Sequence, residues 1–319
     1  MGFAFRTRAG GDTTRVSPVS SVHPLLSRLA GGRPLLLSCD PLAGLGARGV
    51  DVREPAELGA QVRDHAADFA DFYHHEIGAG ADVLCAATGE TVPRALHRLG
   101  MAFRAAALTG AAIEMAIDAA EVAPRPVLVA GLLGSRALAP GLAERVAEEL
   151  DTHAARLVAA GCELILARGF GQATPEARCR SRDAAVASAA ATGVPTWAVV
   201  AIGPARDSVA EGALVDAASA AAASGASAIL FDIEPHDAPA GLAALVDRLC
   251  ATTRVPIGVL LAASGEVAAP DAWAEAARAL LDAGARALGG GVGATARHLA
   301  TLSASLRKGE RSSLFPPAP

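Results

Sequence analysis

Apolar runs of strand length alternate eight times with longer amphipathic or alanine-rich runs, and this alternation constrains the fold more than any other feature. A strand followed by a helix, repeated along a chain, is typical of a parallel β-sheet covered by helices. Strands are predicted over residues 34–40, 82–88, 126–134, 164–169, 196–202, 228–234, 256–262 and 287–291. Helices are predicted over residues 54–78, 92–122, 142–160, 174–192, 210–224, 239–252, 271–283 and 295–308. Eight evenly spaced units favour a closed (β/α)8 TIM barrel in a single domain, with a doubly wound open sheet as the alternative.

The chain of 319 residues is long enough for one such barrel and short extensions. The barrel is predicted to span residues 31–308, with an N-terminal arm and a short capping helix in residues 1–30 and a C-terminal tail in residues 309–319. The arginine-containing start lacks the apolar run of a secretory signal, and every later apolar run is too short to cross a membrane. We therefore expect a cytoplasmic protein without a membrane partner.

Composition excludes several classes of function. The net charge is −5 and no run of basic residues occurs, so a nucleic-acid partner is not expected. Lys308, the only lysine, lies in the last helix or tail, which rules out a lysine Schiff base inside the barrel. The five cysteines are scattered without a Cys-x-x-Cys pair, which predicts buried, reduced thiols. Cys39 and Cys85 fall on adjacent predicted strands, but their spacing does not indicate a redox or metal pair.

Polar residues at the carboxyl ends of the predicted strands are the candidates for function, because active sites of such barrels form at that end. Asp232 and Glu234 follow the sixth strand and share one side of it by alternation. They could bind Mg²⁺ or Mn²⁺ or act as an acid/base pair. The alternative is a solvated acidic loop that also contains His236 and in which Asp237 caps the next helix.

Arg168 interrupts an apolar run at the end of the fourth strand and should point to the barrel mouth. Such a guanidinium could bind a carboxylate or a phosphate. The alternative is an ion pair with Asp40 or Asp232, because charges inside a barrel have to be paired. Asp40 is either a base or ligand-orienting acceptor, or a cap of the first loop. Thr88, at the end of the second strand, is a further candidate for contact with substrate.

A glycine-rich stretch follows the eighth strand and leads into a helix that Thr295 could cap. The N–H groups at a helix start can hold an anion, which makes Gly290, Gly291 and Gly293 candidate substrate-binding residues. The alternative is a tight turn between strand and helix that binds nothing.

The order of these local motifs resembles the homocysteine S-methyltransferase family. The stretches that carry the resemblance are Asp-Pro-Leu-Ala with a glycine-ended helix at 40–49, His-Glu-Ile-Gly-Ala-Gly-Ala-Asp-Val at 75–83, Val-Ala-Gly-Leu-Leu-Gly at 129–134, Ala-Gly-Cys-Glu-Leu-Ile-Leu at 160–166 and the glycine-rich turn at 289–293. The resemblance spans residues 33–307 and implies a TIM barrel with S-methyltransferase activity. It also implies a zinc ion held by three cysteines, which activates the thiol of homocysteine.

The chain departs from that family where the chemistry occurs. Two family cysteines lie in a Gly-Gly-Cys-Cys-Gly motif, where this chain has Gly291 and Val292. The third lies in an Asn-Cys pair after strand six, which corresponds here to Asp232 and Ile233. A Glu-Thr pair that holds the amino-acid substrate corresponds to Arg168 and Gly169, which reverses the charge. Zinc is therefore not expected, no other cofactor is predicted, and methylation of the homocysteine thiol is not expected.

Two classes of function follow from this interpretation. In the first, the protein is an enzyme that transfers a methyl group to or from a small anionic molecule without zinc, using Asp40, Asp232 and Glu234 for catalysis. In the second, the barrel is a non-catalytic module that binds a methyl-transfer partner, with a corrinoid or folate protein as the candidate. An open, polar pocket that contains Arg168 and the two acids, Asp232 and Glu234, favours the enzyme. A mouth plugged by Leu261, Val292 and Phe170 favours the module. The sequence does not indicate the oligomeric state.

Overall fold

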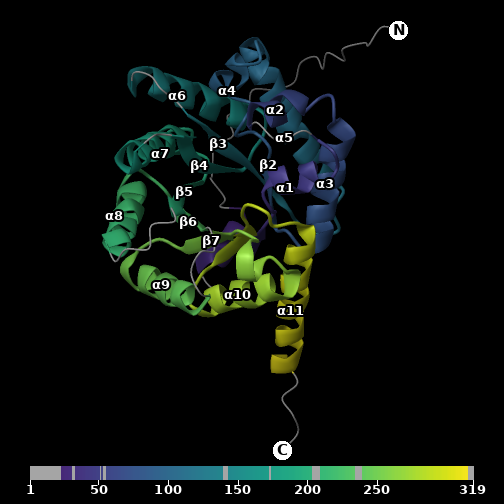
Figure 1. The fold of residues 1–319 in the computed structure, drawn as a ribbon, viewed down its shortest axis with the longest axis vertical. Helices are drawn as coiled ribbons and strands as arrows, with labels where there is room; N and C mark the ends of the chain where they lie inside the picture. The colour runs from purple at the N-terminus through teal and green to yellow at the C-terminus, as the bar shows by residue number, and fades with distance from the viewer. Residues whose placement is uncertain are drawn as a thin grey trace, which may run out of the picture.

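The computed structural model describes residues 23–30, 33–50, 52, 55–138, 143–171, 174–202, 209–233 and 239–314 (Figure 1). Within these residues eight parallel strands pair in sequence order and form a closed barrel. The strands are β1 (Leu35–Leu37), β2 (Val83–Ala86), β3 (Leu128–Leu138), β4 (Leu164–Gly171), β5 (Thr196–Ile202), β6 (Ala228–Ile233), β7 (Ile257–Leu261) and β8 (Ala287–Gly290). The predicted (β/α)8 TIM barrel is confirmed, and all eight strands overlap their predicted ranges. Two of them, β3 and β4, extend past the predicted residues 134 and 169.

The barrel closes through β1 and β8, where Leu35 pairs with Ala287 and Leu37 pairs with Gly289. Gly289 faces the barrel interior at this seam. A Cβ atom built on it would lie 2.9 Å from the Leu37 side chain, so only glycine lets the two strands approach so closely. The short strand β1 is buried throughout, because a parallel strand of a barrel is covered on both faces.

The helices surround the barrel as an outer ring (Figure 1). They are α1 (Pro41–Gly46), α2 (Pro55–Gln61), α3 (Ala66–Ala79), α4 (Pro93–His97), α5 (Ala105–Glu121), α6 (Ala143–Ala159), α7 (Pro175–Ala190), α8 (Val209–Ala223), α9 (Pro239–Thr252), α10 (Pro270–Asp282) and α11 (Ala296–Leu314), with the 3-10 helices η1 (Leu26–Ala30), η2 (Ala102–Arg104) and η3 (Gly265–Val267). None of the described helices combines the length and the apolar character that a membrane span requires.

Two of the predicted helices are divided in the structure. Residues 54–78 form α2 and α3, because His65 adopts a non-helical conformation with φ −115° and ψ 32°. Residues 92–122 form α4, η2 and α5. The break lies at Gly100, which adopts a left-handed conformation with φ 67° and ends the first of these helices. The last helix, α11, extends beyond the predicted residue 308 to Leu314.

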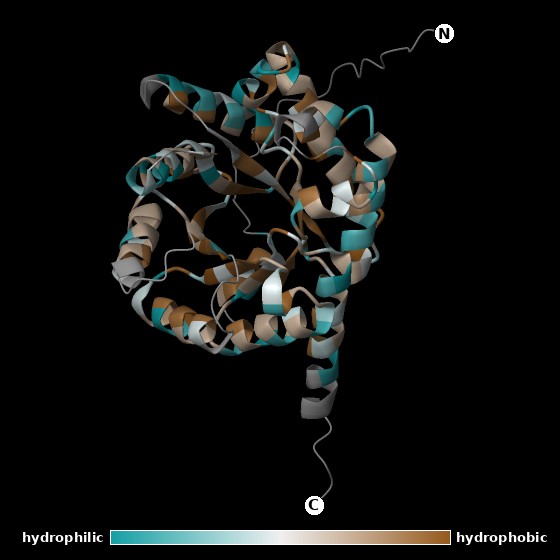
Figure 2. Ribbon diagram, in the orientation of Figure 1, coloured by the Kyte–Doolittle hydropathy of each residue, from teal (hydrophilic) through white to brown (hydrophobic). Residues whose placement is uncertain are grey.

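Two apolar clusters stabilise the barrel. The inner cluster fills the ring of strands and includes Leu35, Leu166, Trp197 and Leu230. The outer cluster packs the opposite faces of the strands against the helices. Figure 2 accordingly shows the strands as hydrophobic and the hydrophilic residues mostly on the helices.

The N-terminal end of the barrel is closed by η1, which forms in the region where the sequence predicts a short capping helix. Leu25, Leu26 and Leu29 from this segment belong to the inner cluster and cover the end of the barrel. The opposite, C-terminal end is where the strands present their polar residues.

Candidate functional site

The described part of the chain contains a cavity of about 80 Å³ at the carboxyl ends of the strands. One water molecule requires about 10–15 Å³ on this measure, so the cavity holds several waters or a small ligand group. Most of its lining is aliphatic, and its charged side chains are Asp40, Glu90, Arg168 and Asp232. The structure therefore brings together the three predicted charged residues Asp40, Arg168 and Asp232 with Gly290 and Gly291, and it adds Glu90.

Arg168 and Asp232 form an ion pair inside the barrel. The Nη2 atom of Arg168 donates a hydrogen bond to Oδ2 of Asp232 over 2.9 Å, and the side chains are only 17% and 16% exposed. Both residues occupy inward-facing positions of their strands, β4 and β6. The predicted alternative for Arg168, an ion pair with Asp232, is thus what the structure shows.

The guanidinium of Arg168 retains hydrogen-bonding capacity beyond this ion pair. Its Nε atom is buried and has no hydrogen-bond partner among the described residues. A buried donor without a partner is costly, because it has lost water without gaining another acceptor. An acceptor on a bound molecule that reaches this group would remove that cost.

Asp40 lies at the start of α1 and caps it. Its Oδ1 accepts a hydrogen bond from the backbone N–H of Leu42 over 3.0 Å, while its own N–H donates to the carbonyl of Gly290 over 2.9 Å. The residue therefore links the first loop to the glycine-rich turn and also lines the cavity. The cap predicted for Asp40 is present, and its position also allows contact with a ligand.

Thr88 is placed differently from the other candidates. Its side chain is buried, and its Oγ1 donates to the carbonyl of Leu132 over 3.0 Å and accepts from the N–H of Leu132 over 2.8 Å. The hydroxyl thus joins the end of β2 to β3 and does not line the cavity. Sequence alone does not distinguish this structural position from a substrate contact, because both place a threonine after a strand.

The glycine-rich turn contributes Gly290 and Gly291 to the cavity wall, whereas Gly293 does not line it. Gly293 adopts a left-handed conformation with φ 79°, and a Cβ atom on it would lie 2.6 Å from the carbonyl oxygen of Ala263. The N–H of Ala263 in turn donates to the carbonyl of Val292 over 2.9 Å. These contacts fix the turn against the loop after β7.

The start of α11 is stabilised by His298 rather than by Thr295 alone. The Nδ1 atom of His298 lies 3.1 Å from the Thr295 N–H and 3.0 Å from its hydroxyl, and Nε2 lies 3.0 Å from the carbonyl oxygen of Ala268. A neutral imidazole with its proton on Nε2 fits these contacts, since Nδ1 then accepts and Nε2 donates. The helix start next to the cavity is therefore partly capped by the chain itself.

Glu234, together with His236 and Asp237, lies outside the described residues. Its predicted partnership with Asp232 stays a prediction. Asp232 itself faces the cavity, as alternation along β6 requires.

Sequence reasoning did not select two thiols that also line the cavity. Cys39 and Cys85 both belong to its wall. Burial raises the pKa of the Cys85 thiol to about 12 and raises that of Cys39 well above its ordinary value. Both thiols are therefore protonated at neutral pH and are poor nucleophiles as they stand.

Two buried carboxyl groups near the cavity were also missed. Glu90 accepts a hydrogen bond of 2.6 Å from the hydroxyl of Ser135. Glu76, on α3, accepts one of 2.9 Å from the N–H of Cys39, and burial raises its pKa to about 7. Acidic residues in helices and loops usually face water, so their sequence positions gave no signal.

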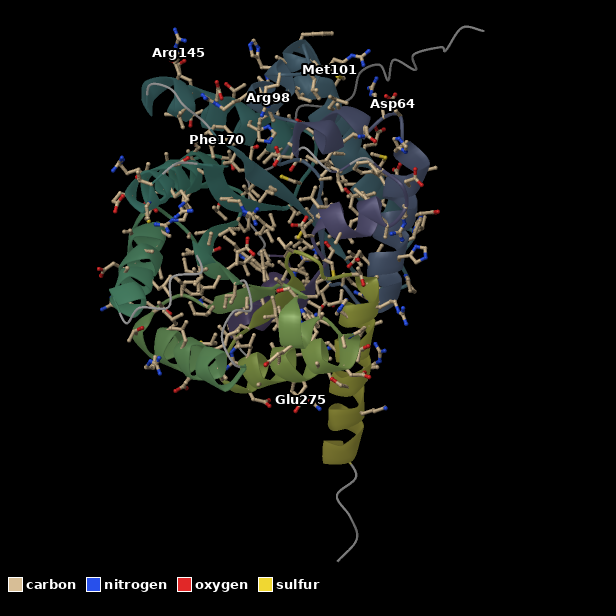
Figure 3. All side chains as sticks on the ribbon, in the orientation of Figure 1. Asp64, Arg98, Met101, Arg145, Phe170 and Glu275 are labelled. Carbon is tan, nitrogen blue, oxygen red and sulfur yellow. The ribbon has the colours of Figure 1, made fainter. Side chains whose placement is uncertain are left out.

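The three residues predicted to plug a non-catalytic barrel do not line the cavity. Leu261 packs into the outer cluster. Phe170 is buried under Arg94, whose guanidinium lies 5.4 Å from the ring centre, and Figure 3 shows it towards α6 and α7. Val292 is 48% exposed. These three residues therefore do not plug the described part of the mouth, whereas the polar pocket predicted for an enzyme stays a prediction, because Glu234 lies outside the described residues.

Comparison with protein-family models decides the family. The model described as homocysteine S-methyltransferase matches residues 70–306, well over half of the chain. The chain belongs to the homocysteine S-methyltransferase family. No curated protein sequence matches it.

Solved structures agree with the fold of this family. The homocysteine methyltransferase MmuM from Escherichia coli superposes with a TM-score of 0.69 in its metallated form and 0.71 in its oxidized form. Both share 21% sequence identity and cover 89% of this chain, which covers 100% and 99% of theirs. A dihydropteroate synthase from Xanthomonas albilineans has a TM-score of 0.51 at 18% identity, covering 89% of this chain and 94% of its own. At these identities the likeness shows the fold alone.

The residues of this family member do not fit the zinc site that the family implies. Gly291 offers no side-chain ligand, Val292 is aliphatic, and Ile233 belongs to the outer cluster. The adjoining Asp232 is occupied by Arg168. At the effective dielectric of a protein, two unit charges 4 Å apart interact by about 4 kcal/mol. A doubly charged ion at that distance from the guanidinium would be repelled by roughly twice this energy.

Proposed function

We propose that this member of the homocysteine S-methyltransferase family binds a small anionic molecule at the barrel mouth and transfers a methyl group to or from it without a zinc-bound thiolate. The observation that carries the proposal is Arg168, the cationic side chain that lines the cavity in the described part of the chain. Its Nε atom, buried beside the ion pair with Asp232, has no hydrogen-bond partner among the described residues. Carboxylates and phosphates match the planar donors of such a group.

The surrounding residues support a defined role for each part of the site. Asp232 holds the guanidinium in place through the 2.9 Å contact. Gly290 and Gly291 line the cavity with backbone, and their lack of side chains lets Cys39 and the backbone of Ala262 pack against the turn. Asp40 and Asp232 supply carboxylates that can orient or accept a proton from the substrate, with Glu234 as a further proposed member.

Zinc independence is proposed from the donor set. A free thiol has a pKa near 8.5, and coordination to zinc is what ionises it at neutral pH. The chain has glycine, valine and isoleucine at the three positions of the family cysteines. We therefore expect methylation of the homocysteine thiol to be absent. We also place the protein in the cytoplasm, where its five free thiols would stay reduced.

Calorimetry with small anions tests the binding site. Acetate, succinate and inorganic phosphate are titrated into the wild-type protein and into Arg168→Met. We expect heat with at least one anion in the wild type and a loss of at least about tenfold in affinity in the variant, as for the loss of a charged hydrogen bond. Arg180→Met, on the exposed side of α7, is the matched control. Absence of heat with every anion would remove the proposed substrate class.

Metal analysis and activity assays test the chemistry. We expect no stoichiometric zinc in the purified protein and no turnover of homocysteine with several methyl donors. Tight zinc together with thiol methylation would show that the ligands lie elsewhere in the chain.

A non-catalytic barrel is the second candidate, because two of the proposed catalytic groups are already engaged. Asp232 is paired with Arg168, and Asp40 caps α1. Such a module would bind a methyl-transfer partner such as a corrinoid or folate protein. Anion binding without turnover of any donor and acceptor pair would favour this function over the enzyme.

A further inference from the structure

The cavity gathers ligands that would suit a cation. Asp40, Asp232, Ser38 and Cys85 all contribute to its wall and carry carboxylate, hydroxyl and sulfur atoms. The backbone N–H of Cys85, on β2, donates to the hydroxyl oxygen of Ser38 over 2.9 Å, which holds the residue after β1 against β2. In the described ranges these residues nevertheless do not form a group of three or more side chains arranged to hold a metal ion.

In this structure the cation next to these residues is the side chain of Arg168. The Arg168 guanidinium lies 2.9 Å from Asp232, with both side chains about one-sixth exposed. Its charge also acts on the thiol of Cys85: burial raises the pKa of that thiol most, and Arg168 partly opposes the rise. Arg168 therefore acts electrostatically on both the acidic and the sulfur side of the cavity.

We propose that the Arg168 guanidinium is an internal cation that takes the place of a metal ion, and that its charge excludes divalent metals from Asp232 and the neighbouring ligands. A divalent metal at the same carboxylate would be repelled by the guanidinium at short range, so the ion pair with Arg168 weakens metal binding to Asp232. Removal of the guanidinium leaves Asp232 buried without a counter-charge, and a divalent cation then binds to it. This inference does not depend on the anion or on the methyl transfer proposed above.

Metal titration of full-length variants tests the inference directly. Zn²⁺ and Mn²⁺ are each titrated by calorimetry into the metal-free wild type, Arg168→Met and Arg168→Lys. We expect Arg168→Met to bind one equivalent of at least one of the two ions at least about tenfold more tightly than the wild type, since a repulsive charge next to the site has been removed. Arg168→Lys, which keeps the positive charge, is expected to behave as the wild type.

A double variant locates the site. The increase in metal affinity expected for Arg168→Met should disappear when Asp232→Asn is added to it. Weak metal binding to surface histidines should be the same in all variants. The inference is overturned when Arg168→Met binds metal no better than the wild type, when Arg168→Lys gains as much, or when the gain persists without Asp232.

A comparison without the Arg168 variants covers the case in which they do not fold. The wild type and Asp232→Asn should bind zinc equally weakly, because Arg168 already occupies the carboxylate. Weaker zinc binding by Asp232→Asn than by the wild type would show that Asp232 holds the metal beside Arg168, which contradicts the proposal.

Discussion

His153, on α6, is a fully buried histidine. Neither ring nitrogen has a hydrogen-bond partner among the described residues, although the carbonyl groups of Thr88 and Leu132 lie close by. Burial, assisted by the charge of Arg156, lowers the pKa of His153 to about 4. The sequence does not separate this residue from an exposed histidine, because both are single polar residues within a helical run.

His153 makes the protein sensitive to acid. The unfolded chain protonates this histidine below its ordinary pKa of about 6.5, whereas the folded chain resists protonation down to about 4. Stability is therefore fully present above pH 6.5 and is lost as the pH falls towards 4, by up to about 3 kcal/mol. The free energy of unfolding, measured with urea, should fall between pH 7 and pH 4 in both proteins. We expect the fall to be smaller in His153→Leu than in the wild type, by up to about 3 kcal/mol. His97→Leu, at an exposed site, is the control, and equal pH dependence in wild type and His153→Leu would contradict the argument.

Glu76 has the opposite effect on stability. Burial raises the pKa of its carboxyl to about 7, so between its ordinary pKa near 4.5 and pH 7 the folded protein holds a proton that the unfolded chain has lost. Stability then falls as the pH rises through this window, by up to about 3 kcal/mol.

Glu76→Gln should remove that loss while keeping the acceptor for the N–H of Cys39. We expect the stability of the variant relative to wild type to be higher at pH 8 than at pH 5, by up to about 3 kcal/mol, in urea unfolding. Glu114→Gln, on the exposed face of α5, should show no such difference. A relative stability that is constant with pH would disprove a raised pKa for Glu76.

At the scale of elements, the glycine-rich turn between β8 and α11 depends on close approach of two backbone segments. Gly293 and Gly49 adopt nearly the same left-handed conformation, with φ 79° and 85°. A Cβ atom on Gly49 meets nothing within 4 Å, whereas one on Gly293 lies 2.6 Å from the oxygen of Ala263. Substitution of these two glycines therefore separates the loss of stability caused by the left-handed φ from the loss caused by steric crowding.

Gly49→Ala should cost about 1–2 kcal/mol of stability, because an L-residue is strained in this conformation. Gly293→Ala should cost about 1–3 kcal/mol more, since the turn has to move away from Ala263. The same movement shifts Gly290 and Gly291, so anion binding at Arg168 should weaken in this variant alone. Chemical denaturation and calorimetry measure both effects, and equal stability losses would show that the approach is not tight.

At the scale of the whole molecule, the two ends of the barrel carry different networks of charge. At the N-terminal end, buried Asp82 accepts hydrogen bonds from Arg28 over 3.1 Å, from Arg125 over 3.4 Å and from the N–H of Leu36 over 3.1 Å. This carboxylate ties η1 and the start of β3 to the first strand. The apolar inner cluster separates it from Arg168 and Asp232 at the other end.

Asp82→Asn should therefore reduce stability without changing the site. Loss of one partner of a buried ion pair costs about 3 kcal/mol, which urea unfolding would detect. The affinity for the anion that binds at Arg168 should stay within about twofold, because stability and function occupy opposite ends of such barrels. Asp71→Asn, on the exposed face of α3, is the control, and a large change in anion affinity would show that the ends are coupled.

The order of residues along the chain is enough to predict the fold class and the approximate position of every strand. Helices show an apolar periodicity along the chain, and the parallel strands of a barrel are apolar runs because both of their faces are buried. These local patterns are enough to locate the strands and helices. The sequence also determined which residues stand where the family has its zinc ligands, since that depends only on order along the chain. The boundaries of the helices near His65 and Gly100 were less accessible, because a local break does not interrupt the apolar periodicity.

Which polar groups come into contact depends on how the chain folds in three dimensions. Arg168 and Asp232 are 64 residues apart in sequence, and the registers of β4, β5 and β6 bring them to one level of the barrel. The same closure turns Thr88 towards β3, places Cys39 and Cys85 in one cavity wall and buries Glu76. These partners lie on different strands and meet across the barrel. The energy of each contact depends on burial and distance, so no periodic sequence pattern indicates which residues will pair.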